Sequence, residues 1–330
     1  MSSSPVPKTQ PTILFNTTSS TLSLGPAFPV PISPPTEHLI RVHATAITNG
    51  ELTWGLFVDW PFLHVPTFDV AGTTLTPVEG SPFKVGDEIY GRVTAAREGC
   101  AREYATITPS EAALRPQDLS DVDAATVPMS AETAWQALFE HGELAAPQAD
   151  GSKVAANAGK RVLILAASGG VGLWAVHFAR LAGAHVVGTC SEKNAEFVLG
   201  LGADEVVDYT KTSLEAWARA KEGRKFDVVF DCAGSRSMED AWTVVREGAR
   251  FVSIVPGYKE PDGGPPRGVK GLFFVMESRG AELAVISGLW ERGLCKTVVD
   301  SVWRLEEYEK AFAKTASGHA RGKVVIRIGT

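Results

Sequence analysis

A cluster of small residues at positions 166–172 is the segment of this chain whose composition and spacing point most directly to chemistry. It reads Ala-Ala-Ser-Gly-Gly-Val-Gly and lies between an apolar run, 162–166, and an amphipathic stretch, 171–182. Small residues at such a junction let the backbone approach a pyrophosphate, which the free N–H groups and dipole of the helix start stabilise. We therefore predict a dinucleotide-binding loop, with a structural tight turn as the alternative. The cofactor-binding residues predicted in it are Ser168, Gly169, Gly170 and Val171.

The segment 189–194, at the end of the next predicted strand, bears on the choice between NADH and NADPH. An NAD site places an Asp or Glu about 20 residues past the glycines, where it accepts hydrogen bonds from the ribose 2′-OH. Here the segment reads Thr-Cys-Ser-Glu-Lys-Asn, and Ser191 lies 19 residues after Gly172. A hydroxyl and an ammonium group, which suit a 2′-phosphate, replace the acid. We predict NADPH, bound here by Ser191, Lys193 and Asn194.

The same three positions also have a structural interpretation. Ser191 is a suitable N-cap for the helix predicted over 192–201, a role worth about 1 kcal/mol. Lys193 could be a solvated surface charge, although a Lys in the first turn opposes the helix dipole by roughly 0.3–1 kcal/mol. Glu192 argues against a bound 2′-phosphate, because its carboxylate repels a phosphate.

Strands and helices alternate from residue 161 onward. Such alternation implies right-handed crossovers and a parallel, doubly wound sheet. The predicted helices cover 171–182 and 192–201, and the predicted strands cover 162–166, 185–189, 206–207, 226–232 and 250–255.

The rest of the chain has a different pattern. The first half contains many short strands punctuated by Gly and Pro, and the alternation over 39–46 predicts a half-buried strand. Residues 145–159 are low in bulky side chains and predict an enlarged surface loop. After a Gly/Pro-rich loop, 256–271, we predict two helices and a closing strand, over 281–292, 306–317 and 324–328.

Composition restricts the class of partner. The chain has 330 residues, 44% of them hydrophobic and 21% charged, with a formal net charge of −6, which argues against general binding to nucleic acid or to an anionic membrane. The four cysteines form no CxxC pair, and the seven histidines show no metal-ligand spacing. Residues 1–12 lack the features of a signal peptide, and no run is long enough to span a membrane. We predict a soluble cytoplasmic protein with reduced thiols.

Six segments, taken in order, carry a family resemblance: Asp69–Gly72, Phe83–Asp87, Thr133–Leu138, Ala166–Gly172, Leu201–Asp204 and Gly318–Lys323. The chain resembles the medium-chain dehydrogenase/reductase superfamily, specifically its zinc-free quinone oxidoreductase and enoyl reductase branches. The resemblance implies an α/β fold with a Rossmann NADPH-binding domain over 129–267. It also implies a split, β-rich GroES-like catalytic domain over 1–128 and 268–330, with the active site in the cleft between the domains.

The residues at the expected zinc positions predict that the chain binds no metal. Zinc-dependent relatives carry a Cys near the first active-site loop and a His in a Gly-His-Glu stretch. Here the loop 46–51 reads Ala-Ile-Thr-Asn-Gly-Glu and the later position is Phe68, which cannot ligate a metal. Without a Lewis acid, alcohol oxidation loses the group that stabilises an alkoxide. Hydride addition to a quinone or an activated double bond is easier, because the negative charge spreads into an enolate.

Further site residues follow from their place at strand ends or from the resemblance. The resemblance implies that Asn49 and Trp54 face the nicotinamide, that Thr133 opens the helix against which its ring packs, and that Phe273 belongs to a segment closing over the ring. Each of these four predicted substrate-pocket residues could instead be structural, with Trp54 and Phe273 as core residues. The remaining predicted cofactor-binding residues are Tyr209, Cys232, Val255, Phe274, Val275 and Lys323.

The function expected from these observations is NADPH-dependent reduction of a quinone or an α,β-unsaturated carbonyl compound, with a small molecule as substrate and no identified proton donor. Two alternatives stay open: a trans-acting enoyl reductase that serves a polyketide synthase, and a cofactor-binding protein without turnover. The apolar segment 271–275 predicts an edge strand. Exposed edges are usually paired or covered, so we expect a homodimer.

Overall fold

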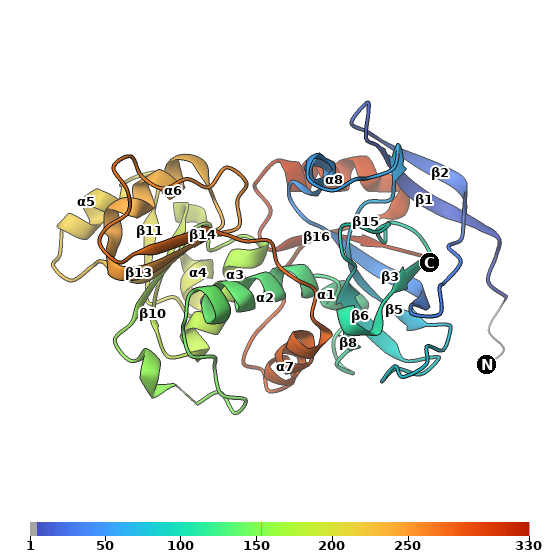
Figure 1. Ribbon diagram of the computed structural model, residues 1–330, viewed down its shortest axis with the longest axis horizontal. Coiled ribbons are helices and arrows are strands. Elements are labelled where there is room, and N and C mark those ends of the chain that lie inside the picture. Colours follow the sequence, from blue (N-terminus) through green and yellow to red (C-terminus); the bar gives the residue numbers. More distant parts are fainter. Residues whose placement is uncertain (1–4, 153, 330) are drawn as a thin grey trace. The chain divides into compact units, whose positions relative to one another are not determined.

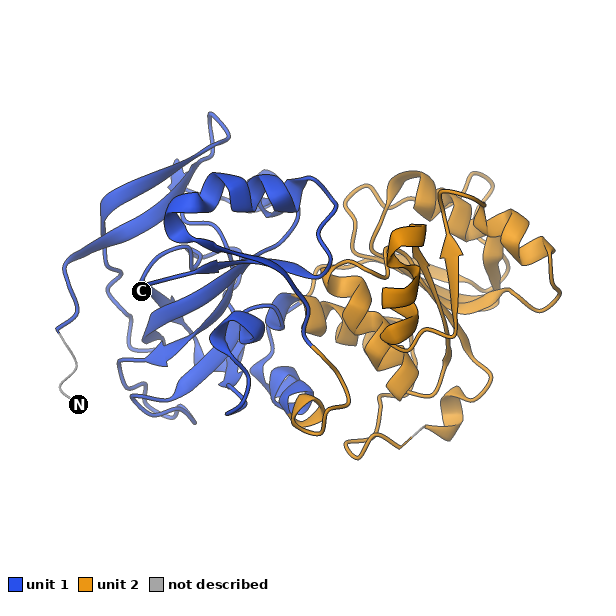
Figure 2. Cartoon of the chain, turned by 180° about the vertical axis from the view of Figure 1, so that it is seen from behind, with its two compact units in different colours: residues 1–129, 277–287, 297–330 blue, residues 130–276, 288–296 orange. Residues whose placement is uncertain are grey.

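The computed structural model describes residues 5–152 and 154–329, and the chain divides into two compact units (Figure 2). Unit 1 comprises residues 1–129, 277–287 and 297–330, and unit 2 comprises residues 130–276 and 288–296. The family resemblance predicted that the chain returns to the first unit at residue 268. The structure places it later, because the strand Lys270–Phe273 pairs in parallel with the preceding strand of unit 2.

A parallel sheet forms the centre of unit 2. Its strands are β9 (Arg161–Ile164), β10 (His185–Cys190), β11 (Glu205–Asp208), β12 (Phe226–Asp231), β13 (Val245–Ser253) and β14 (Lys270–Phe273). Among the described residues their order is β11-β10-β9-β12-β13-β14, and every pairing is parallel. Counted from β9, this is the order third, second, first, fourth, fifth, sixth, which characterises the doubly wound dinucleotide-binding fold. The predicted fold class is therefore confirmed.

Helices connect and cover these strands (Figure 1). They are α2 (Pro128–Trp135), the π-helix η3 (Gln136–His141), η4 (Ala155–Asn157), α3 (Gly170–Leu181), η5 (Glu192–Asn194), α4 (Ala195–Gly200), α5 (Leu214–Arg219), α6 (Ser235–Ala241) and η6 (Trp242–Val244). α3 packs on β9 and β10 and buries Trp174, Ala175 and Phe178, whose spacing places them on one helix face. The side chains of α5 and α6 form a second cluster with Leu163 and Phe251.

Unit 1 is rich in strands. One sheet consists of β2 (Thr21–Pro29), β1 (Thr9–Asn16) and β4 (Leu63–His64). A larger sheet consists of β15 (Val299–Arg304), β16 (Lys323–Arg327), β3 (His38–Ile47), β5 (Asp69–Thr74), β6 (Glu88–Arg92) and β8 (Ala112–Leu114), with β7 (Tyr104–Ile107) paired to β3. Its helices are η1 (Glu51–Leu56), η2 (Pro109–Glu111), α1 (Asp121–Ala124), α7 (Gly280–Glu291, shared with unit 2), η7 (Leu305–Glu307) and α8 (Tyr308–Ala316).

Strand β3 corrects one prediction. The alternation over 39–46 predicted a half-buried strand, yet nearly every side chain of β3 is buried, with Arg41 the exposed exception. The reason is that β3 is a central strand: it pairs with β5, β7 and β16, while α1 and α8 also pack against it. The apolar and polar positions of a strand therefore do not by themselves show which faces are covered.

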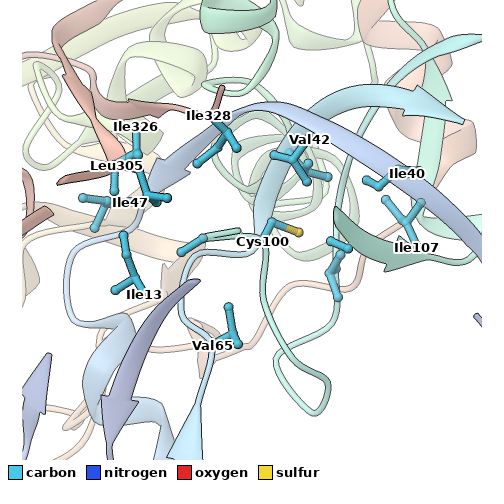
Figure 3. Packing of buried hydrophobic residues seen from close by; sticks show 14 of the residues in the cluster. Ile13, Ile40, Val42, Ile47, Val65, Cys100, Ile107, Leu305, Ile326 and Ile328 are labelled. Atoms are coloured by element: carbon cyan, nitrogen blue, oxygen red, sulfur yellow. The ribbon is translucent and has the colours of Figure 1, made fainter. Parts of the chain in front are cut away.

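The core of unit 1 is completed by the end of the chain. Leu305, Ile326 and Ile328 pack in one cluster with Ile13 and with side chains of β3 (Figure 3). Cys100 lies inside the same cluster, and its burial raises the pKa of its thiol to about 12. Cys100 is thus an unreactive core thiol.

Candidate functional site

The glycine-rich loop lies between β9 and α3, as predicted. A Cβ at Gly172 would lie 2.3 Å from the carbonyl oxygen of Ala166, so only glycine lets the helix approach the strand this closely. Gly169 occupies the N-cap of α3 without a side chain to bond the first turn, and that turn carries no acidic residue. The N–H groups and the positive dipole end of α3 therefore suit an anion such as a pyrophosphate.

Thr189, near the end of β10, holds the glycine-rich loop in place. Its hydroxyl oxygen accepts a hydrogen bond from the N–H of Ala166 at 3.1 Å, and its carbonyl oxygen accepts one from the N–H of Ala167 at 3.0 Å. The side-chain amide of Asn194 donates to the hydroxyl oxygen of Ser168 at 3.2 Å. The glycine-rich loop and the end of β10 thus form one hydrogen-bonded framework, which includes the predicted cofactor-binding residues Ser168 and Asn194.

The predicted 2′-phosphate residues lie together after β10. Ser191 is at the N-cap position of η5, but among the described residues its side chain makes no capping hydrogen bond. The hydroxyl group is therefore not committed to the structural role that was the alternative interpretation. Lys193 is exposed within the same turn, and Tyr209 is exposed just after β11.

A second lysine, Lys211, also belongs to this region and was missed by the sequence analysis. Its ammonium nitrogen lies 2.6 Å from a carboxylate oxygen of Glu192. Lys211 therefore offsets the negative charge of Glu192, which was the argument against a bound phosphate. Asp208, which is the register partner of Cys190, accepts two hydrogen bonds from Thr210, and these bonds lower the pKa of Asp208. The signal for Lys211 was its position, three residues after a strand that pairs with β10.

The other predicted cofactor residues of unit 2 lie just beyond the carboxyl ends of β12, β13 and β14. Cys232 follows β12, Val255 follows β13, and the pair 274–275 follows β14. Gly234 has φ +70°, and a Cβ there would lie 2.6 Å from a methyl group of Val255, so these two loops are in close contact. The Phe274 ring is buried beside His141, whereas Phe273 and Val275 are exposed. The exposure of Phe273 rules out the core interpretation.

In unit 1 the first loop carries two predicted substrate-side residues. Asn49 is exposed, and Trp54 on η1 is half-buried and stacks on Phe68 with ring centroids 5.4 Å apart. Leu56 and Phe57, which follow Trp54, are exposed. The loop therefore presents apolar side chains together with one amide.

A buried charged cluster lies beneath this loop. The carboxylate of Glu51 accepts hydrogen bonds from the N–H groups of Thr48 at 2.8 Å and Thr67 at 3.0 Å. The ammonium nitrogen of Lys323 lies 2.9 Å from a carboxylate oxygen of Asp69 and donates to the hydroxyl oxygen of Thr48 at 2.7 Å. Burial raises the pKa of Glu51 to about 7, and Lys323 opposes that shift. Neither Glu51 nor Asp69 was predicted to have a role of its own.

The residues around Phe68 do not fit a catalytic zinc ion. Phe68 is 1% exposed and stacks on both Trp54 and Trp60. Among the described residues no group of three or more His, Cys, Asp or Glu side chains is placed to hold a metal. The phenyl ring of Phe68 and the indole rings stacked on it supply none of the N, O or S ligands that zinc needs.

Two predicted residues have contacts that the sequence did not indicate. Thr133 was expected to open a helix, but α2 begins at Pro128, so this part of the prediction is wrong, whereas a contact between Thr133 and the substrate stays a prediction. Pro128 needs no hydrogen-bond acceptor at the first position, and the N–H of Met129 donates to Asp69 at 2.7 Å. Lys323, predicted to bind cofactor, is buried in its ion pair with Asp69, and a contact with the cofactor stays a prediction.

Known proteins resemble this chain along most of its length. A family model described as "Zinc-binding dehydrogenase" matches residues 201–326. The "Probable zinc-binding oxidoreductase, mitochondrial" of Arthroderma benhamiae is 44% identical, covering 98% of this chain and 98% of that protein. The "Chloroplast envelope quinone oxidoreductase homolog" of Arabidopsis thaliana is 33% identical, covering 90% of this chain and 92% of that protein.

The fold is shared with solved structures. The quinone oxidoreductase from Coxiella burnetii superimposes with a TM-score of 0.80 at 21% sequence identity, covering 98% of this chain and 100% of that one. The strand order of unit 2 and the strand-rich, discontinuous unit 1 agree with this likeness. The chain therefore belongs to the medium-chain dehydrogenase/reductase superfamily, in its quinone oxidoreductase-like branch.

Proposed function

We propose that this chain is a zinc-independent oxidoreductase that uses NADPH to reduce a quinone or an α,β-unsaturated carbonyl compound. When bound, the nicotinamide supplies the hydride. The observation that carries the proposal is the end of β10, where Ser191 and Lys193 stand in place of the carboxylate that an NADH site needs. In the described part of the chain, the hydroxyl group of Ser191 makes no capping hydrogen bond to η5, which supports this assignment.

The residues of unit 2 divide the work of holding the cofactor. The first turn of α3 would bind the pyrophosphate through backbone N–H groups. Ser191 and Lys193 would bind the 2′-phosphate, while Lys211 offsets the charge of Glu192 nearby. Tyr209, exposed after β11, would flank the adenine, and the loops after β12, β13 and β14 would face the nicotinamide.

The side chains around Phe68 and Trp54 in unit 1 support the choice of a quinone or enone as the hydride acceptor. Although the matching family model and one relative carry zinc in their names, Phe68 and its aromatic neighbours do not fit that metal. An acceptor whose reduced form is an enolate or a hydroquinone needs hydrogen-bond donors rather than a Lewis acid. The exposed Leu56 and Phe57 beside Trp54 favour an apolar acceptor of this kind.

Oxidation of NADPH and NADH against a panel of quinones and enones, with and without a chelator, tests the proposal. We expect kcat/KM for NADPH to exceed that for NADH by at least about tenfold, as a phosphate held by charge-assisted bonds implies. Turnover confined to carrier-bound enoyl chains would favour the polyketide alternative. Cofactor binding without turnover of any acceptor would favour a non-catalytic role. One zinc ion per chain, lost together with activity, would contradict zinc independence.

We also propose that the chain forms a homodimer through β14. This strand lies at one edge of the unit 2 sheet, and the exposed Phe273 and Val275 lie at its end and just after it. An unpaired edge with apolar side chains is usually covered by another strand. Light scattering should give twice the chain mass, and a monomer at micromolar concentration would contradict the proposal.

Cytoplasmic localisation stays a prediction. The relative from Arthroderma benhamiae is named a mitochondrial protein. Within residues 5–152 and 154–329, no helix is both long enough and apolar enough to cross a membrane. Imaging of the tagged chain would distinguish the two compartments.

A further inference from the structure

A single buried carboxylate joins the loops that follow β12 and β13. Asp231, the last residue of β12, is 0% exposed. One of its oxygens accepts hydrogen bonds from the N–H groups of Ala233 at 2.9 Å and Gly234 at 2.8 Å. Its other oxygen accepts from the hydroxyl of Ser253 at 2.8 Å, and that hydroxyl oxygen accepts from the N–H of Val255 at 3.1 Å. One carboxylate thereby fixes the start of both loops.

The third strand end is tied to the same point. Asp231, Ser253 and Phe273 are register partners across β12, β13 and β14. The carbonyl oxygen of Ser253 accepts a hydrogen bond from the N–H of Phe274 at 3.1 Å, and the carbonyl oxygen of Asp231 accepts one from Ile254 at 3.2 Å. Asp231 and Ser253 therefore lie at the centre of the edge from which all three loops leave.

The choice of a charged residue at this buried point calls for a reason. No described Lys, Arg or His forms an ion pair with Asp231, so hydrogen bonds from neutral donors alone compensate its burial. A buried carboxylate contributes little net stability even when it is well bonded, because its desolvation is expensive. What it does provide is direction, since charge-assisted bonds are short and strong and fix their donors closely.

We propose that Asp231 and Ser253, which we call the strand-end brace, are positioning residues for hydride transfer. They set the loops that carry Cys232, Val255 and Phe274, and through them the orientation of the nicotinamide ring. This inference rests on the proposed function, since it assumes that a nicotinamide binds at this edge. The adenosine end of the cofactor lies at β10 and β11 and does not depend on the brace.

Two substitutions break the brace without adding volume. In Ser253→Ala the hydroxyl is lost, which leaves one oxygen of Asp231 and the N–H of Val255 without their partner. In Asp231→Asn the amide nitrogen faces a hydroxyl oxygen that already accepts from Val255, so the serine proton loses its acceptor. The matched control is Asp227→Asn on the same strand, because Asp227 lies at the opposite end of β12 and pairs with Arg246.

The measurements are kcat, the KM and Kd for NADPH, the fluorescence of bound NADPH, and the Kd for 2′,5′-ADP, which carries only the adenosine half. We expect kcat to fall roughly tenfold to a hundredfold in both brace variants, the cost of a misplaced reacting group. The Kd for 2′,5′-ADP should stay within about twofold, and the emission of bound NADPH should move toward that of free NADPH. Asp227→Asn should match the wild-type chain in all five measurements.

The outcomes separate the two proposals. A wild-type chain that binds neither NADPH nor NADH overturns both. If the wild-type chain turns over normally and the kcat of folded Ser253→Ala stays within twofold of the wild-type value, the brace alone is overturned. The brace is also overturned if the affinity for 2′,5′-ADP falls by the same factor as kcat, because such a loss indicates general unfolding. If Asp231→Asn does not fold, as judged by circular dichroism, Ser253→Ala decides the question, since it removes one hydroxyl group and keeps the carboxylate.

Discussion

Unit 1 buries a pair of carboxyl groups and unit 2 buries the single carboxylate of Asp231, and the two sites are stabilised in different ways. In unit 1, the ammonium ion of Lys323 pairs with Asp69, and its charge also lowers the pKa of Glu51 against the effect of burial. In unit 2, Asp231 has no ion-pair partner among the described residues and is held by two N–H groups and one hydroxyl. The carboxyl groups of unit 1 are thus stabilised by an opposite charge, and the carboxylate of unit 2 by the dipoles of neutral donors.

The difference determines how each site responds to a change of pH or to the loss of a cation. Burial raises the pKa of Glu51 to about 7 although the charge of Lys323 opposes the shift, so a proton can neutralise this carboxylate. Dipoles from the backbone are fixed by the fold and carry no proton that pH can remove. Unit 1 should therefore be sensitive to pH and to the loss of Lys323, whereas no described cation of unit 2 pairs with Asp231.

Removal of the shared ammonium ion should have the largest effect. Lys323→Met leaves Asp69 buried without its counter-ion, and such losses destabilise proteins by roughly 3–5 kcal/mol. Urea unfolding at pH 8 measures the change. Lys310→Met, which removes an exposed lysine paired with Glu307, should change the free energy of unfolding by less than about 1 kcal/mol. A loss below 1 kcal/mol for Lys323→Met would mean that its charge is not needed.

The pH dependence of stability should follow from Glu51. Its folded pKa of about 7 exceeds the ordinary value of 4.5, so the folded state binds the proton more tightly. The resulting stabilisation is fully present below pH 4.5 and is lost as the pH rises through 7. The difference corresponds to about 3 kcal/mol at 1.36 kcal/mol per pH unit.

Glu51→Gln isolates this contribution. The free energy of unfolding of the variant, measured from pH 4.5 to pH 8, should lack the decline that the wild-type chain shows over that range. The exposed substitution Glu215→Gln should retain the decline. Parallel curves for the wild-type chain and Glu51→Gln would show that Glu51 does not titrate in this range.

Lys193→Ala tests whether the cations of unit 2 serve a ligand. Loss of a charge-assisted bond of roughly 1.5–3 kcal/mol should raise the KM for NADPH about tenfold to a hundredfold and leave NADH kinetics unchanged. Stability should change little, because Lys193 is exposed. Lys221→Ala, another exposed lysine of unit 2, is the control, and equal weakening of both cofactors in Lys193→Ala would refute the phosphate assignment.

A smaller effect should come from the backbone of the glycine-rich loop. Ala166 has φ +54°, in the left-handed region that disfavours residues with a Cβ. Ala166→Gly should therefore raise the free energy of unfolding by about 1 kcal/mol and leave the Kd for NADPH unchanged. Thermal unfolding measures the gain, and a lower midpoint would show that the alanine methyl group contributes packing that outweighs the strain.

The sequence predicted the local features of this molecule well and the long-range ones poorly. The glycine-rich loop and the alternation of strands and helices follow from periodicity and residue size within short windows, and the structure contains both. Lys323 and Thr48 are 275 positions apart, and Ser253 and Asp231 are 22 apart. These pairs meet only through strand register, which no short window contains. The start of α2 was missed for the same reason, since Asp69 helps to set it.

The position of β16 also determines when unit 1 can form during synthesis. β16 pairs with β3 and brings Lys323 to Asp69, yet all of unit 2 is translated before it. At roughly 5–20 residues per second, the ribosome needs about 10–40 s to go from residue 129 to residue 323. During that interval β3 lacks its pairing with β16, and Glu51 and Asp69 lack the charge of Lys323. A nascent chain stalled before residue 323 should therefore bind chaperones through unit 1, while its nucleotide-binding unit is already folded.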